Sequence, residues 1–260
     1  MNTLILIWIG AVGLAIGSFL NVVIYRLPLK KRFGLGRSIC PKCGTQLRWY
    51  HNIPLASWAA LRGKCAFCRQ PISWRYPLVE LMTAGAYVYF WAYLGFSPMF
   101  FVWAALVSAL IVIIFVDLDH QIIPDSITLS GMAAGLAASF LPNGLGIVQS
   151  LIGLVVGGGS LYLIAVLGEA LFRKEAMGGG DIKMAAMLGA FLGWQKVLLV
   201  FLAAAVIGLV VGVIAMLISS KMRRDRMIPF GPYLAVAAVI SGLYGDRIIG
   251  FYLTRIVGLN

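Results

Sequence analysis

Charged residues are scarce in this sequence, and their scarcity is informative. Asp, Glu, Lys and Arg make up only 12% of the 260 residues, whereas 61% are hydrophobic. A soluble domain of this length cannot bury that much apolar surface, which excludes an ordinary soluble enzyme. A bilayer is the natural solvent for such a chain, so the composition predicts an all-α polytopic membrane protein.

Acidic residues are fewer still, and one long segment has none. The chain carries nine acidic and 21 basic residues, and eleven of the basic ones lie between Arg26 and Arg75, where no acidic residue occurs. This is the pattern of a large cytoplasmic loop under the positive-inside rule. Loop orientation explains the net charge of +12 without a nucleic-acid partner. Contact with anionic lipid headgroups is an additional possibility.

Histidine is almost absent, and two common enzyme signatures are missing. With two histidines and no His-Glu-x-x-His pattern, the chain does not fit a zinc-dependent protease. The glycine run before Asp181 lacks the Gly-Lys-Ser/Thr ending of a P-loop, which argues against a phosphate-binding loop. Low-complexity segments and convincing internal repeats are missing as well.

Long apolar stretches separated by polar turns predict about eight transmembrane helices. No basic residue precedes the first stretch and no small-residue cleavage site follows it, so we expect a retained span rather than a cleaved signal. The sixth stretch is shorter than the about 20 residues that usually cross a bilayer. The expected spans cover residues 3–24, 78–94, 99–116, 126–141, 147–172, 182–192, 197–218 and 230–244.

The positions of the basic residues orient these spans. With the loop 25–77 in the cytoplasm, the chain consists of a first transmembrane helix (1–24), this loop and a transmembrane domain (78–260). The turns at 95–98 and 142–146 then lie outside. The segments expected at the cytoplasmic face are 117–125, 173–181 and 220–228.

Two motifs with four acidic residues between them are expected at this cytoplasmic face. Asp117, Asp119 and Asp125 lie within nine positions, and Asp181 follows the glycines 178–180. Ionisable groups at the ends of apolar spans are costly, so they are functional candidates. Two carboxylates that converge in a low-dielectric cleft share a proton, so one can activate water while the other protonates the leaving amine. The pattern thus favours peptide hydrolysis without a covalent enzyme intermediate.

Simpler roles are open for the same residues. Asp125 follows Pro124 and fits a helix N-cap, Asp119 could be a solvated loop residue, and Asp117 could be merely interfacial. The glycine run can let the backbone approach another segment and adopt angles closed to other residues, or it can be a plain flexible loop. The competing function is a transporter or channel with a carboxylate proton relay, although a relay would place its acids near mid-span.

All four cysteines lie in the basic loop, as Cys40-Pro-Lys-Cys43 and Cys65-Ala-Phe-Cys68. Two Cys-x-x-Cys pairs about twenty residues apart predict a tetrathiolate Zn²⁺ site, so the loop is expected to resemble a zinc ribbon. Disulfides are not expected in the reducing cytoplasm, and redox-active or unordered thiols are the alternative. Four sulfur ligands leave no open position, so the metal would stabilise the loop rather than take part in catalysis.

Several further motifs occur in a fixed order along the chain. They are Gly17-Ser-Phe-Leu-Asn-Val-Val-Ile-Tyr-Arg-Leu-Pro28, His51-Asn-Ile-Pro-Leu-Ala-Ser-Trp58, Leu61-Arg-Gly-Lys64, Arg75-Tyr-Pro-Leu-Val-Glu-Leu81, the Asp-x-Asp-x5-Pro-Asp segment from Asp117 to Asp125, the Gly-x-Gly-Asp segment from Gly178 to Asp181, and Ile228-Pro-Phe-Gly-Pro-Tyr233. Together with the two cysteine pairs, they resemble the motifs of the bacterial prepilin peptidases. The resemblance covers essentially the whole chain.

This resemblance implies a bifunctional enzyme of the bacterial inner membrane whose active site faces the cytoplasm. It implies cleavage of the basic leader of type IV prepilins or type II secretion pseudopilins, followed by N-methylation of the new N-terminal residue with S-adenosylmethionine. The segment 78–260 is then an aspartic peptidase domain with Asp117 and Asp181 as its catalytic pair. The supporting residues of the active-site loop are then Gly178, Gly180, Asp119 and Asp125.

The sequence contains no recognisable site for the methyl donor. No Gly-x-Gly-x-x-Gly pattern follows a predicted strand, and no soluble methyltransferase domain fits into the remaining length. We therefore expect the donor in the loop 25–77. Glu80 is a candidate for holding a basic leader, or it is a structural residue near the start of its span.

Overall fold

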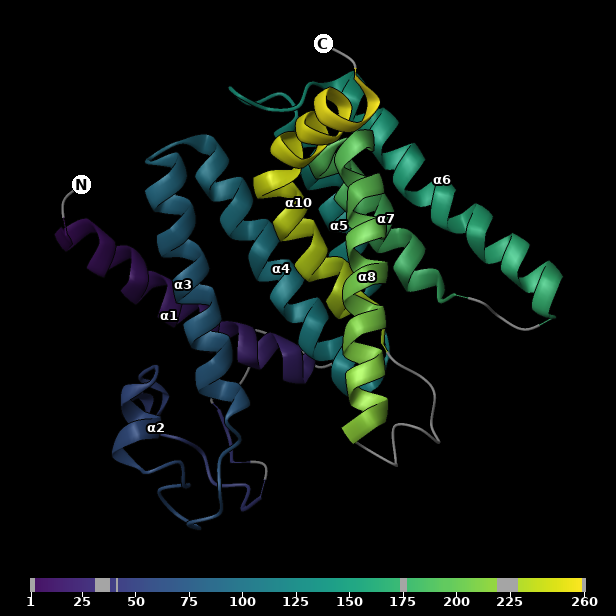
Figure 1. Ribbon diagram of the computed structural model, residues 1–260. Helices are drawn as coiled ribbons and strands as arrows, with labels where there is room; N and C mark the ends of the chain where they lie inside the picture. Colours follow the sequence, from purple (N-terminus) through teal and green to yellow (C-terminus); the bar gives the residue numbers. More distant parts are fainter. Residues whose placement is uncertain (1–2, 31–37, 41, 174–176, 219–228, 259–260) are drawn as a thin grey trace. The chain divides into compact units, whose positions relative to one another are not determined.

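The computed structural model describes residues 3–30, 38–40, 42–173, 177–218 and 229–258 (Figure 1). This part of the chain is helical, and its only β-structure is two isolated bridges in the cysteine loop. The all-α prediction is therefore confirmed. The expected internal segment 220–228 lies outside the described residues. The chain divides into two compact units, residues 1–116 and residues 117–260.

The first unit consists of two long packed helices, the cysteine loop that connects them, and most of a third long helix. Close packing of α1 and α3 depends on small residues: a Cβ at Gly13 or Gly17 would lie only 2.6 Å from the backbone of the other helix. The elements are α1 (Thr3–Arg26), a short 3-10 helix (Trp49–Asn52), α2 (Ala56–Ala60), α3 (Arg75–Leu94) and α4 (Pro98–His120), whose last turn belongs to the second unit.

The second unit is built around a short buried helix, α7. Residues 184–190 of α7 are all buried, and the helix packs against α5, α6, α8 and α10 (Figure 1). A Cβ at Gly189 would collide with the carbonyl of Gly153 on α6, so glycine is required where these two helices meet. The elements are α5 (Asp125–Ala138), α6 (Ile147–Phe172), α7 (Gly179–Leu192), α8 (Trp194–Ile218), α10 (Gly231–Tyr252) and a π-helical turn (Leu253–Val257).

Five of the described helices are long and apolar enough to cross a membrane: α1, α4, α6, α8 and α10. The other three expected spans coincide with α3, α5 and α7, which do not meet this criterion of length and composition. α5 and α7 are only 14 residues long, and the shortness of α7 fits its position, since this helix is covered by neighbouring helices rather than by lipid. The composition and these spans agree on a membrane protein.

Candidate active site and metal centre

Asp117 occupies a buried position in the last turn of α4. The sequence suggested that this segment leaves the helix at residue 117, but α4 continues to His120. The side chain of Asp117 is only 5% exposed, and its Oδ2 accepts a hydrogen bond of 3.0 Å from the backbone N–H of Gly231, the first residue of α10. A Cβ on Gly231 would lie 2.6 Å from this oxygen, so only glycine allows the contact.

Asp181 lies in the first turn of α7 and is half-buried. Burial, and next the negative charge of Asp117, raise the pKa of Asp181 to about 6, against a hydrogen bond from the backbone of Gly178 that lowers it. The structure thus brings the two candidate carboxylates within electrostatic reach of each other. Two carboxylates this close do not both ionise readily, which is the condition for one to act as an acid and the other as a base.

Ile123 packs between the two backbones that frame these carboxylates. A Cβ at Gly180 would lie 2.9 Å from the Cβ of Ile123, and a Cβ at Gly231 would lie 3.2 Å from its Cδ1. Both glycines therefore permit a close approach to the same side chain. The sequence analysis did not single out Ile123, and it named Gly231 only as part of a family motif. Pro232 follows Gly231, and proline is typical of the first turn of a helix, so it indicated that a helix begins here.

The glycines before Asp181 do not adopt unusual backbone angles, and one of them serves packing. None of residues 178–180 has a positive φ, and Gly178 has a φ of −70°. The expectation of angles closed to other residues is wrong here. A Cβ at Gly178 would lie 3.3 Å from Asp181 Oδ2, and a Cβ at Gly179 would meet nothing within 4 Å. Of the three glycines, only Gly180 is in tight contact with another segment of the chain.

Asp119 and Asp125 lie at the exposed edge of this site. Asp119 is exposed in the last turn of α4. The N-cap of α5 is Pro124, and the side chain of Asp125 makes no capping hydrogen bond, so the predicted capping role is wrong. Both carboxylate oxygens of Asp125 instead accept hydrogen bonds from Lys183 Nζ, at 2.8 and 2.7 Å. This ion pair joins the start of α5 to the second turn of α7, two residues after Asp181.

The four cysteines converge on one point. The sulfur atoms of Cys40, Cys43, Cys65 and Cys68 all lie within 4.8 Å of one another, and those of Cys40 and Cys68 are 3.9 Å apart. Tetrahedral Zn²⁺ with Zn–S bonds of about 2.3 Å requires sulfur separations of about 3.8 Å, so the donor set fits the predicted ion. Hydrogen bonds from the side chain and backbone of Thr45 lower the pKa of Cys43 to about 6. Against a backbone hydrogen bond from Gln70, burial and the neighbouring cysteines raise the pKa of Cys68 to about 11, so a bound metal would be needed to hold all four as thiolates.

The two cysteine pairs form matching turns. In each turn the N–H of the first cysteine, Cys40 or Cys65, donates to a carbonyl five residues later, at 3.0 and 2.9 Å respectively. The residue four positions after that cysteine, Gly44 or Arg69, donates back to the cysteine carbonyl and has a left-handed backbone, with φ of 70° and 60°. An isolated β-bridge closes each turn. The zinc-ribbon-like character predicted for the loop is consistent with this arrangement.

Comparison with known proteins gives one consistent family. Residues 11–94 match the Bacterial Peptidase A24 N-terminal domain, and residues 104–213 match the Type IV leader peptidase family. The chain belongs to the type IV leader peptidase family. It is 39% identical to a prepilin leader peptidase/N-methyltransferase of Stutzerimonas stutzeri, over 93% of this chain and 91% of that protein, and 36% identical to one of Legionella pneumophila, over 94% and 93%.

A third relative of the same name, from Myxococcus xanthus, is 44% identical over 83% of this chain but only 64% of its own length. No solved structure matches the chain. These results confirm the predicted family of leader peptidases and its enzyme class, a peptidase combined with an N-methyltransferase. The reading as a transporter or channel has no counterpart among these three relatives.

Proposed function

We propose that this protein cleaves the basic leader of type IV prepilins or type II secretion pseudopilins and then N-methylates the new N-terminal residue with S-adenosylmethionine. The observation that carries the peptidase part is the approach of Asp117 and Asp181, from the ends of two different helices, in a partly buried site. The names of the relatives support both reactions.

Cleavage in this proposal uses the two carboxylates as a general acid and a general base. The ionised carboxylate takes a proton from water, whose oxygen attacks the scissile carbonyl, and the protonated partner donates its proton to the leaving amine. The Gly231 N–H holds Asp117 in a fixed orientation for this role. Gly178, Gly180, Asp119 and Asp125 support the site from its edge.

The substrate class follows from the membrane setting. A pilin N-terminal segment is an apolar helix that can lie in the bilayer against the long apolar helices of this protein, while its charged leader stays in the cytoplasm. The basic loop supports a cytoplasmic active site under the positive-inside rule. A reporter fused after Lys64 should therefore be cytoplasmic, and one fused after Ser97 or Asn143 periplasmic.

Methyl transfer needs a donor and a freed amine. We place S-adenosylmethionine in the first unit, whose cysteine loop is stabilised by Zn²⁺, because residues 25–77 are the main polar segment of the chain. The proposal is tested by adding purified protein to a prepilin with and without S-adenosylmethionine and measuring product masses. Loss of the leader mass without the donor, and a further gain of one methyl group with it, is the expected result. An intact prepilin in both samples would refute the function.

A further inference from the structure

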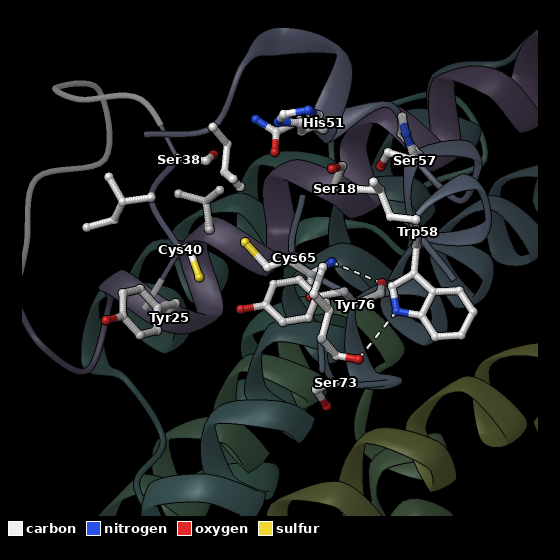
Figure 2. Close-up of a pocket in the computed structure, with 18 of the residues that line it drawn as sticks. Ser18, Tyr25, Ser38, Cys40, His51, Ser57, Trp58, Cys65, Ser73 and Tyr76 are labelled. Atoms are coloured by element: carbon white, nitrogen blue, oxygen red, sulfur yellow. Dashed lines mark hydrogen bonds between the residues drawn. The ribbon is translucent and has the colours of Figure 1, made fainter. Parts of the chain in front are cut away.

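A large cavity lies within the first unit, between the cysteine loop and the facing parts of α1 and α3 (Figure 2). Its volume is about 1080 Å³, slightly above the range of about 300–1,000 Å³ that is usual for small-molecule sites. It therefore has room for a small cofactor together with one further side chain. Residues that line it include Ser18, Tyr25, Trp58, Tyr76 and Glu80.

Glu80 gives this cavity its only acidic side chain. It is the single acidic residue among residues 1–116, a unit in which eleven residues are Lys or Arg. Glu80 is 7% exposed, so a ligand reaches it only by entering the cavity. A carboxylate is costly to bury unless hydrogen bonds or a cation compensate it. A buried carboxylate in this otherwise basic unit therefore requires a compensating partner.

Neutral groups hold Glu80 in position. Its Oε2 accepts a hydrogen bond of 2.8 Å from the backbone N–H of Leu55, and the hydroxyl group of Ser18 provides another. Leu55 has a positive φ of 58°, so the loop adopts a strained backbone where it meets the carboxylate. These contacts orient the carboxylate, and a cationic ligand in the cavity would compensate the cost of burying its negative charge.

Aromatic rings form much of the remaining wall. Tyr25, Trp58 and Tyr76 all line the cavity, as Figure 2 shows. The indole N–H of Trp58 donates to the carbonyl of Ile72 at 3.4 Å, and its ring packs on Trp74 with ring centres 4.3 Å apart, so its orientation is set. Aromatic faces attract cations such as ammonium and sulfonium groups. Arg26 and Lys42 line the cavity as well, so the acid, the rings and these bases together favour a ligand that carries both positive and negative groups.

We propose that this cavity is the methyl-transfer site, in which the aromatic rings receive the sulfonium methyl donor and Glu80 binds the α-amino group of the cleaved pilin. This inference rests on the methyl-transfer half of the proposed function and adds its location and acceptor-binding residue. All lining residues lie within residues 15–80, whereas Asp117 and Asp181 belong to the second unit. The two reactions therefore use different residues in different units.

The chemistry of the step balances with these groups. The lone pair of the neutral α-amine forms a bond to the methyl carbon, and the methyl–sulfur bond breaks with its electron pair remaining on sulfur. The sulfonium becomes a neutral thioether, and the amine becomes a secondary ammonium. That ammonium loses one proton to the Glu80 carboxylate, from which it passes to water. Positioning of the two reactants accounts for most of the rate gain.

Kinetics on a pre-cleaved pilin test the role of Glu80. In Glu80→Gln, the KM for the pre-cleaved pilin should rise about tenfold or more, because a hydrogen bond to a charged group is lost. Leader cleavage of full prepilin, the Kd for S-adenosylmethionine and the zinc content should stay unchanged. Glu169→Gln, an exposed neutralisation on α6, is the matched control and should leave both reactions unaltered.

A second variant tests the aromatic wall. Tyr25→Ala changes an exposed residue of the cavity and should weaken S-adenosylmethionine binding several-fold, with cleavage intact. Normal methylation kinetics in Glu80→Gln, with normal zinc content, would overturn the assignment of Glu80. A raised Kd for the donor with an unchanged KM for the pilin would overturn it too. A wild-type protein that never methylates would instead refute the proposed function itself.

Discussion

The Asp117 carboxylate accepts a hydrogen bond from the backbone N–H of Gly231, which lies 114 residues later in the chain, at 3.0 Å. The contact joins the last turn of α4 to the first residue of α10. It orients a buried acid with a main-chain donor, and a side chain at position 231 would disturb it. The orientation of Asp117 thus depends on how closely two helix ends approach each other.

This contact predicts a selective effect of adding one methyl group. Gly231→Ala should reduce cleavage about 100-fold, because its Cβ would lie 2.6 Å from Asp117 Oδ2 and displace the carboxylate. Gly179→Ala is the control, since its Cβ would meet nothing within 4 Å. Initial rates of leader removal, normalised to the amount of membrane-inserted protein, measure both. Equal rates in the two variants would contradict the packing argument.

Replacement of the paired acids should separate the two reactions. Asp117→Asn and Asp181→Asn should each abolish cleavage of full-length prepilin and leave expression and insertion intact, because acid–base catalysis needs both carboxylates. Both variants should still methylate a pilin supplied without its leader, which mass measurement would show. Asp119→Asn and Asp125→Asn should keep measurable cleavage; for Asp125 the loss is that of an exposed ion pair, worth at most about 1 kcal/mol. An inactive Asp119→Asn beside an active Asp117→Asn would mean that the wrong acid was chosen.

The two reactions should depend on pH in opposite directions. Because the pKa of Asp181 is raised to about 6, the acid keeps its proton below that pH and loses it above. Cleavage requires one proton on the pair, so its kcat/KM should fall about tenfold per pH unit above this value. Methyl transfer requires a neutral α-amine with a pKa of about 7.7–8.0, so its rate should rise until that pH. A cleavage rate that climbs steadily to pH 8 would contradict the assignment.

Removal of the metal should affect the first unit before the second. Purified protein should contain one zinc per chain, measured by elemental analysis, and Cys40→Ser or Cys65→Ser should lower this content strongly. Both cysteines line the proposed methyl-transfer cavity, so methylation should be lost first. Cleavage should persist at first, since none of the four sulfur ligands lies in the unit that holds Asp117 and Asp181. A metal-free preparation with a protease-resistant, fully methylating loop would refute the structural role.

Several features were predictable because they depend on local sequence. Long apolar stretches are stable in a bilayer as helices, because a helix satisfies its own backbone hydrogen bonds. The positions of the helices therefore followed from composition and length. The spacing of two Cys-x-x-Cys pairs is typical of a tetrahedral metal site. The clustering of Cys40, Cys43, Cys65 and Cys68 was therefore expected and is found. The close approach of the glycine run to another segment was expected too, and Gly180 shows it.

Other expectations failed where a distant segment competes with local preference. Asp125 has the sequence context of a helix cap, but Lys183 of α7 offers its carboxylate a charged partner, which a backbone N–H cannot match. The glycines 178–180 were expected to adopt backbone angles closed to other residues, yet they lead into an ordinary helix. Glycine is required at position 180 because the helix lies close to Ile123 there.

The sequence by itself determined the membrane-embedded helices, the metal ligands and the list of candidate acids, because hydropathy and ligand spacing act over a few neighbouring residues. Only the tertiary structure decided which carboxylates lie near each other and which groups surround them. It gave Asp117 the donor Gly231 and left Asp119 exposed, and it buried Glu80 beside a cavity. These outcomes depend on contacts between residues far apart in the chain, and burial and neighbouring charge, which set the chemistry of a carboxylate, exist only after those contacts form.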